Sequence, residues 1–139
     1  MSDLRSAAEP EACLCLVLHA HLPYVRHPEY KDFIEEDWFF EAVTDTYLRL
    51  AAMLVQLRRD GVPFRLALGI TPTLLSMLGD ALLLDRYEAR LAGLNRLAAQ
   101  EEQRTRADAA MHRTAWFYVD HFSAAARLFH EQCGRDLVA

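Results

Sequence analysis

The sequence predicts an α/β protein that begins with a parallel βαβ unit. Residues 12–18 form an unbroken apolar run, which is typical of a strand buried on both faces of a parallel sheet. A long amphipathic helix follows, and residues 63–70 have the alternation of a second strand. Strand, long helix and strand in this order predict two parallel strands joined by a right-handed crossover.

Two histidines stand where the first strand, expected over about residues 12–19, comes to its end. Side chains alternate along a strand, so Val17, His19 and His21 share one face. Pro23 cannot donate a hydrogen bond to a sheet ladder, so strand pairing should stop before it. Because α/β proteins place their sites at the carboxyl ends of strands, the two imidazoles mark a candidate site.

Apolar spacing predicts the crossover helix over about residues 35–60. Phe39, Val43 and Tyr47 begin one apolar stripe that continues through the helix. Gly61 suits the left-handed conformation that closes a helix. The loop before the helix, residues 25–32, has no periodicity and is long enough to form a lid or a wall of the site.

Helices dominate the rest of the chain. Thr71-Pro72 predicts the start of a short helix, with a capping hydroxyl followed by proline at the first helical position. A long helix follows, with a break expected at residues 104–108, and a last helix ends at Gly134. Gly69, in the second strand, leaves room for a close approach, although sheet packing explains it equally well.

The composition indicates which partners the protein can have and in which cellular compartment it is expected. The chain has 139 residues and a formal net charge of −5, which argues against a nucleic-acid partner. Its apolar runs are shorter than the ~18 residues of a membrane helix, and its N-terminus lacks the basic start of a signal peptide. Cys13, Cys15 and Cys133 are expected to be reduced core thiols of a cytoplasmic protein.

The histidine pair allows three interpretations. It could ligate a metal, bind a polar substrate by hydrogen bonds, or be structural. The chain has no Cys-x-x-Cys or His-Glu-x-x-His motif, and His112, His121 and His130 do not share a helix face cleanly, which weakens the metal interpretation. A metal-dependent amidohydrolase and a non-catalytic helical interaction module remain as alternatives, and no cofactor is expected.

Acidic and aromatic residues follow the histidines. The acidic side chains are interpreted as a solvated loop and helix start rather than an acid–base pair, and are Glu29, Asp32, Glu35, Glu36 and Asp37. Three aromatic residues then stand in a row, of which a helix can bury one or two. Trp38 could be a platform on which a sugar stacks or, with equal weight, a packing residue at the helix end.

Several stretches resemble glycoside hydrolase family 57, in its 1,4-α-glucan branching enzyme subgroup. Residues 18–29, LHAHLPYVRHPE, resemble the first conserved region of that family. Four further stretches resemble it in the same order, and are EDWFFEA at 36–42, TYL at 46–48, LGITPTL at 68–74 and GRDLV at 134–138. The resemblance runs from about residue 12 to the end.

The resemblance implies that this chain is the N-terminal part of an incomplete seven-stranded (β/α) barrel. It also implies a retaining mechanism with a glutamate nucleophile and an aspartate acid/base, and no metal. His19 would line the subsite where an α-1,4-glucan is cut, and His21 would support it. Tyr24 and Trp38 would contact substrate. Amylase and 4-α-glucanotransferase activities of the same family remain open.

The chain departs from the family pattern in one large respect. The nucleophile and acid/base regions lie beyond residue 139, and nothing in the sequence matches either. We therefore expect a flexible lead-in at residues 1–11, a fragment of the catalytic barrel at residues 12–139, and no branching activity from this chain alone. The missing part of the barrel would be a partner, and the strands should expose an unpaired edge.

Overall fold

Two parallel strands form the sheet of this protein. The computed structural model describes residues 14–138. Strand β1 (Val17–Ala20) pairs in parallel with β2 (Ala67–Ile70), so that His19 lies opposite Gly69. The predicted parallel pair is confirmed, although both strands are shorter than predicted. Residues 1–13, which include the expected lead-in and the first residues of the predicted strand, lie outside the described part of the chain.

A long helical crossover joins the two strands, as the sequence predicts. It runs through α1 (Glu36–Glu41), a π-helical segment η1 (Ala42–Tyr47) and α2 (Leu48–Arg59). Gly61, with a φ of 71°, follows its end in the left-handed conformation. The π-helical turns were not predicted, because the apolar spacing of the sequence does not distinguish them from an α-helix.

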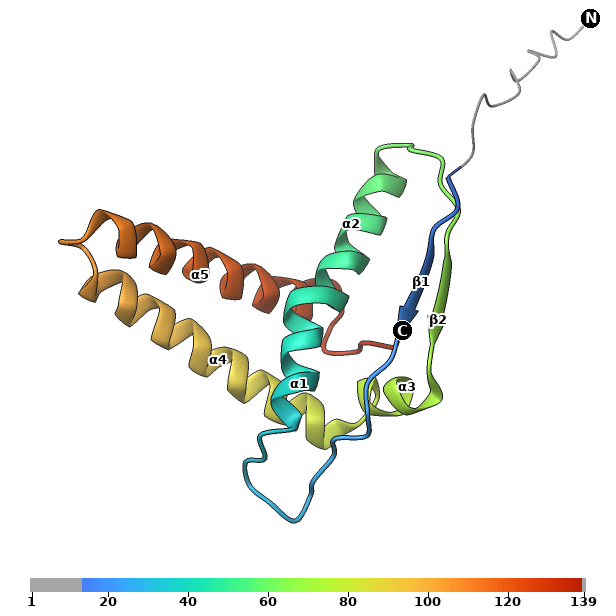
Figure 1. Ribbon diagram of the computed structural model, residues 1–139, viewed down its shortest axis with the longest axis horizontal. Coiled ribbons are helices and arrows are strands. Elements are labelled where there is room, and N and C mark those ends of the chain that lie inside the picture. The colour runs from blue at the N-terminus through green and yellow to red at the C-terminus, as the bar shows by residue number, and fades with distance from the viewer. Residues whose placement is uncertain (1–13, 139) are drawn as a thin grey trace, which may run out of the picture.

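The remaining helices begin at side-chain caps. Helix α3 (Pro72–Leu78) begins where Thr71 accepts a hydrogen bond from the backbone of Leu74, and α4 (Ala81–Arg104) begins at Asp80. Helix α5 (Ala109–Arg127) begins at Asp108 and continues into η2 (Leu128–Gln132). The predicted break between the long helices is therefore confirmed, and α4 and α5 form an antiparallel hairpin that projects from the molecule (Figure 1). None of the described helices is long and apolar enough to cross a membrane.

The core lies where the crossover, α3, the first half of α4 and the end of α5 meet. Tyr87 packs edge-on against Phe129, with ring centroids 5.0 Å apart, and both side chains are buried. The buried cluster draws on most of the chain and comprises Val25, Phe39, Phe40, Val43, Leu48, Leu74, Met77, Leu78, Leu83, Tyr87, Leu91, Ala125 and Phe129. This core holds the crossover and the strand exits in place.

The helices cover only one side of the sheet (Figure 1). Along β1, Val17 and His19 are exposed, whereas Leu18 and Ala20 are partly buried. The expectation that β1 is buried on both faces is therefore wrong within residues 14–138, where no element covers the face of His19. For the same reason Cys15 is exposed rather than a core thiol, while Cys133 packs against the core as expected.

Candidate functional site at the carboxyl end of the first strand

The two predicted imidazoles lie together on the open face of β1. The rings of His19 and His21 have centroids 6.2 Å apart and planes inclined by 21°. Alternation along the strand places them on one side, and both side chains are exposed. Two nearly parallel imidazoles at a strand exit can offer hydrogen bonds to a polar ligand.

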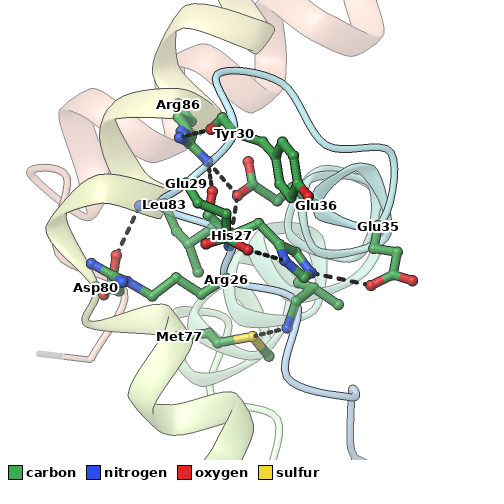
Figure 2. A network of polar contacts seen from close by, with 11 residues as sticks. Arg26, His27, Glu29, Tyr30, Glu35, Glu36, Met77, Asp80, Leu83 and Arg86 are labelled. Atoms are coloured by element: carbon green, nitrogen blue, oxygen red, sulfur yellow. Dashed lines mark hydrogen bonds and ion pairs between the residues drawn. The ribbon is translucent and has the colours of Figure 1, made fainter.

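The loop that follows the histidines is anchored to α3 and α4. Val25 is fully buried, and its backbone N–H donates to the sulfur of Met77 at 3.4 Å. Next along the chain, the Arg26 Nε donates to Oδ2 of Asp80 at 2.6 Å. Asp80 also accepts at Oδ1 from the backbone N–H of Leu83, so one carboxylate both caps α4 and holds the loop (Figure 2).

A buried ion pair fixes the middle of the same loop. Glu36 in α1 is only 1% exposed and pairs with Arg86 of α4. The same guanidinium donates to the backbone carbonyls of His27 and Tyr30, and Glu36 accepts from the backbone N–H of His27 at 3.2 Å (Figure 2). The interpretation of the acidic residues as solvated is therefore wrong for Glu36, because a cation fifty residues away in the sequence compensates its burial.

The His27 ring is held between two carboxylates. Its Nδ1 lies 3.2 Å from Glu29, and its Nε2 lies 3.2 Å from Glu35. The hydrogen bond with Glu29 is the largest cause that raises the pKa of His27 above its ordinary value of 6.5. The ring also lies against that of Phe33, with centroids 3.8 Å apart and planes inclined by 37°. Glu29 and Glu35 thus have a structural partner, and the pKa of Glu29 is lowered by its own backbone N–H and by His27.

These contacts decide between the two interpretations of the loop. Residues 25–30 are fixed to α1, α3 and α4 through side chains from three elements, so the loop is a wall rather than a lid. Asp80 and Arg86, whose side chains bond to the loop, were not identified from the sequence. Asp80 had a local signal, because it follows Gly79 and precedes an apolar helix, whereas nothing local distinguishes Arg86 from the other arginines.

The aromatic residues divide as expected. Phe39 and Phe40 are buried, and Trp38 is 51% exposed, so one ring of the three faces outward. Tyr24 is also exposed, next to the anchored loop. Helix α1, which carries Trp38, begins at the same end of the molecule as the strand exits (Figure 1). Within residues 14–138, no ring contact joins Trp38 or Tyr24 to the two histidines.

Each of the three histidines in the helices has polar partners of its own. The Nδ1 of His121 accepts from Arg49, and its Nε2 lies 2.7 Å from Asp45. His112 and His130 lie near glutamates of α4 at 3.7 and 3.6 Å. In the described part of the chain, no three His, Cys, Asp or Glu side chains are grouped as a metal ion would require.

The fold and the site together define a class of protein. Parallel strands joined by a long helical crossover, with polar side chains at the strand exits, are the arrangement of α/β proteins, which place their sites at the carboxyl ends of strands. The particular family follows from sequence comparison. The model of glycosyl hydrolase family 57 matches residues 15–135, and the chain belongs to that family.

Known proteins are similar to this chain in both sequence and fold. A 1,4-alpha-glucan branching enzyme of Thermococcus kodakarensis is 38% identical over 89 residues, which are 64% of this chain and 13% of that protein. The alpha-amylase AmyC of Thermotoga maritima has a TM-score of 0.78 at 41% identity, over 86% of this chain and 23% of the other. The family resemblance that the sequence suggests is confirmed.

Two solved branching enzymes of the family complete the comparison. The enzyme from Thermococcus kodakaraensis, in complex with glucose and additives, has a TM-score of 0.78 at 25% identity, over 88% of this chain and 22% of the other. The enzyme from Pyrococcus horikoshii has a TM-score of 0.77 at 28% identity, over 86% and 22%. The chain therefore spans less than a quarter of these relatives, and its fold is the N-terminal part of their (β/α)7 barrel.

Proposed function

We propose that this chain forms one wall of an α-1,4-glucan site in a branching enzyme of family 57. The observation that carries the proposal is the exposed, nearly parallel pair His19 and His21 at the end of β1, in a chain matched by that family over residues 15–135. In this role His19 contacts the sugar at the cleaved bond, and His21 supports it. Tyr24 and Trp38 offer aromatic faces to the glucan.

The chain contributes binding and orientation rather than bond cleavage. A retaining transfer needs two carboxylates, about 5–5.5 Å apart, as nucleophile and acid/base. The acidic side chains around the anchored loop already have partners, since Glu29 and Glu35 bond to His27, and Asp80 bonds to Arg26. A general acid also needs a raised pKa, whereas that of Glu29 is lowered. We infer that the catalytic pair belongs to the remainder of the barrel and that this chain alone neither cuts nor branches amylose.

A second activity has a specific observation in its favour. The solved alpha-amylase AmyC is more similar to this chain in sequence, at 41%, than the solved branching enzymes at 25% and 28%. Hydrolysis of the same α-1,4 bond is therefore the alternative activity. A 4-α-glucanotransferase activity of the same family is a third possibility. In all three, residues 12–139 are part of the catalytic barrel and residues 1–11 are a lead-in. On the sequence grounds given above, we also propose that the enzyme acts in the cytoplasm, without a nucleic-acid or membrane partner.

Titration with an α-1,4-linked oligosaccharide tests the binding role. Maltoheptaose is added to the 139-residue chain, and the ring signals of His19 and His21 are followed by NMR. We expect both to shift, and we expect cellopentaose, which has β-1,4 links between the same sugar units, to leave them unchanged. Equal responses to the two sugars, or none to maltoheptaose, would contradict the proposal.

The two tryptophans provide a matched pair of variants. Trp38 is 51% exposed on α1 and Trp116 is 63% exposed on α5. The variant Trp38→Ala should weaken the maltoheptaose response, whereas Trp116→Ala should retain it, because Trp38 belongs to α1, which begins at the end of the molecule where the strands exit, and Trp116 belongs to the projecting hairpin (Figure 1). Incubation of the chain with amylose completes the test, with no new α-1,6 links and no new reducing ends expected.

A further inference from the structure

The glycine of β2 lies directly beside the first histidine of the site. In the parallel register His19 is the partner of Gly69, and both belong to the face that no described helix covers. A Cβ atom added at Gly69 would stand 3.2 Å from Nδ1 of His19. This separation is closer than ordinary van der Waals contact, so the imidazole occupies the space that a side chain at position 69 would need.

The other glycines differ from Gly69 in this respect. Gly61 and Gly134 have positive φ angles and no atom within 4 Å of an added Cβ. An added Cβ at Gly93, in α4, meets only the Arg96 side chain at 3.9 Å. Of the glycines in the structure, Gly69 alone would bring a new methyl group against a residue of the site.

The nearest atom belongs to an imidazole ring and not to the backbone. An alanine at position 69 would therefore displace the ring of His19 by a few tenths of an ångström and leave the strands paired. Such a shift matters because hydrogen bonds weaken steeply with distance and angle. It also disturbs the arrangement with His21, whose ring plane is inclined by only 21° to that of His19.

We propose that Gly69 is a positioning residue of the site, which by its lack of a side chain sets the orientation of the His19 imidazole toward bound sugar. The inference rests on the proposed function for its ligand, but the packing of His19 over Gly69 is independent of it. If Gly69 served sheet packing alone, Gly69→Ala would change only the stability of the strands. If Gly69 positions His19, the same substitution changes the orientation of the imidazole ring and the affinity for sugar.

NMR of the 139-residue chain tests this without added sugar. In the wild-type chain we expect nuclear Overhauser contacts between the Gly69 α-protons and the His19 ring. In Gly69→Ala the ring signals of His19 and His21 should shift. Gly93→Ala is the same substitution at an open helix position, and it should leave these signals unchanged. Unchanged His19 signals in Gly69→Ala would overturn the proposal.

A double-mutant cycle separates positioning from general effects on the sheet. In the His19→Ala background the space beside position 69 is free, so Gly69→Ala should raise the melting temperature, because alanine suits a strand better than glycine. With His19 present, the same change should raise it less or lower it. Equal shifts in the two backgrounds would overturn the proposal.

Sugar affinity distinguishes this inference from the proposed function. If maltoheptaose binds, Gly69→Ala should weaken binding by about tenfold, the effect of one misplaced hydrogen bond, and Gly93→Ala should not. Full affinity in Gly69→Ala would overturn the positioning role. If wild-type chain does not respond to maltoheptaose, the proposed function fails, and the ring shifts and the cycle still decide whether Gly69 positions His19.

Discussion

Arg86 forms an ion pair with Glu36, a carboxylate that is only 1% exposed at the start of the crossover helix. The same guanidinium donates to two backbone carbonyls of the loop between β1 and α1. This relationship ties the second long helix to the first and to the wall of the site. It makes the position of the loop depend on a residue outside the five short stretches that first indicated the family.

Removal of Arg86 should destabilise the protein strongly. The variant Arg86→Met leaves the buried Glu36 carboxylate without its cation, and loss of one partner of such a pair costs about 3–5 kcal/mol. Urea unfolding followed by tryptophan fluorescence measures the change in free energy. The double variant Glu36→Gln with Arg86→Met should recover part of it, since no charge then remains buried.

Arg90, one helical turn further along α4, is the control for this experiment. Its ion pair with Asp37 spans 3.3 Å, and both side chains are substantially exposed. Pairs of this kind contribute only about 0–1 kcal/mol. Similar losses in Arg90→Met and Arg86→Met would show that the buried pair has no special role.

Stability should depend on pH through His27. Its pKa is raised from 6.5, so it contributes stability fully below pH 6.5, and this is lost as the pH rises through the raised value. The pKa of Glu29 is lowered from 4.5, so its contribution is present above pH 4.5 and lost as the pH falls through the lowered value. The cluster is therefore expected to be strongest between these two values.

Melting temperatures of His27→Gln and wild type test this expectation. The deficit of the variant should shrink from about pH 6 to about pH 8, the range in which histidine titrates. The double variant Glu29→Gln with Glu35→Gln lacks the carboxylates that favour the charged ring. In that background the effect of His27→Gln should vary little with pH, and a persistent trend would assign it to another group.

Asp80 should matter more than an ordinary helix cap. Asp80→Ala removes the cap of α4, worth about 1 kcal/mol, together with the bond to Arg26, which adds about 1 kcal/mol because the pair is partly buried. Asp108→Ala removes a cap of α5 and serves as the control. Chemical unfolding should give a larger loss for Asp80→Ala, and Asp80→Asn should fall between the two. Equal losses would argue that the loop is not anchored there.

The open sheet should make the chain self-associate. Within residues 14–138 each strand has one unpaired edge, Val17 is 72% exposed, and all four residues of β2 are exposed. Light scattering on a concentration series should show growing assemblies, and Val17→Lys should reduce them. Val55→Lys, the same change on exposed α2, is the control and should reduce them less. A monomer at all concentrations would contradict this expectation.

Local signals predicted most of the fold. Helix α3 begins as expected, because its hydroxyl cap and its proline act within one turn of the chain. The break between α4 and α5 lies within the predicted window for a similar reason, since the cap of Asp108 is local. Such contacts join neighbours in sequence, so a single sequence contains them.

Contacts between distant segments were not predictable in the same way. The burial of Glu36 depends on Arg86, and the close approach that Gly69 permits depends on His19, fifty residues earlier. A sequence shows that Gly69 leaves room but not what fills it. The histidine pair itself was found because alternation and strand direction place it, while its ligand remains a proposal.

The wide spread of the core along the chain has a consequence for synthesis on the ribosome. The backbone of the βαβ unit is complete at Ile70, yet the cluster that supports it includes Phe129, and Leu137 packs against that cluster. At ~5–20 residues per second, Phe129 is made on the order of 3–12 s after Ile70. During that interval the nascent chain has both strands but only half of the core that supports them, and such a state exposes apolar surface and aggregates easily.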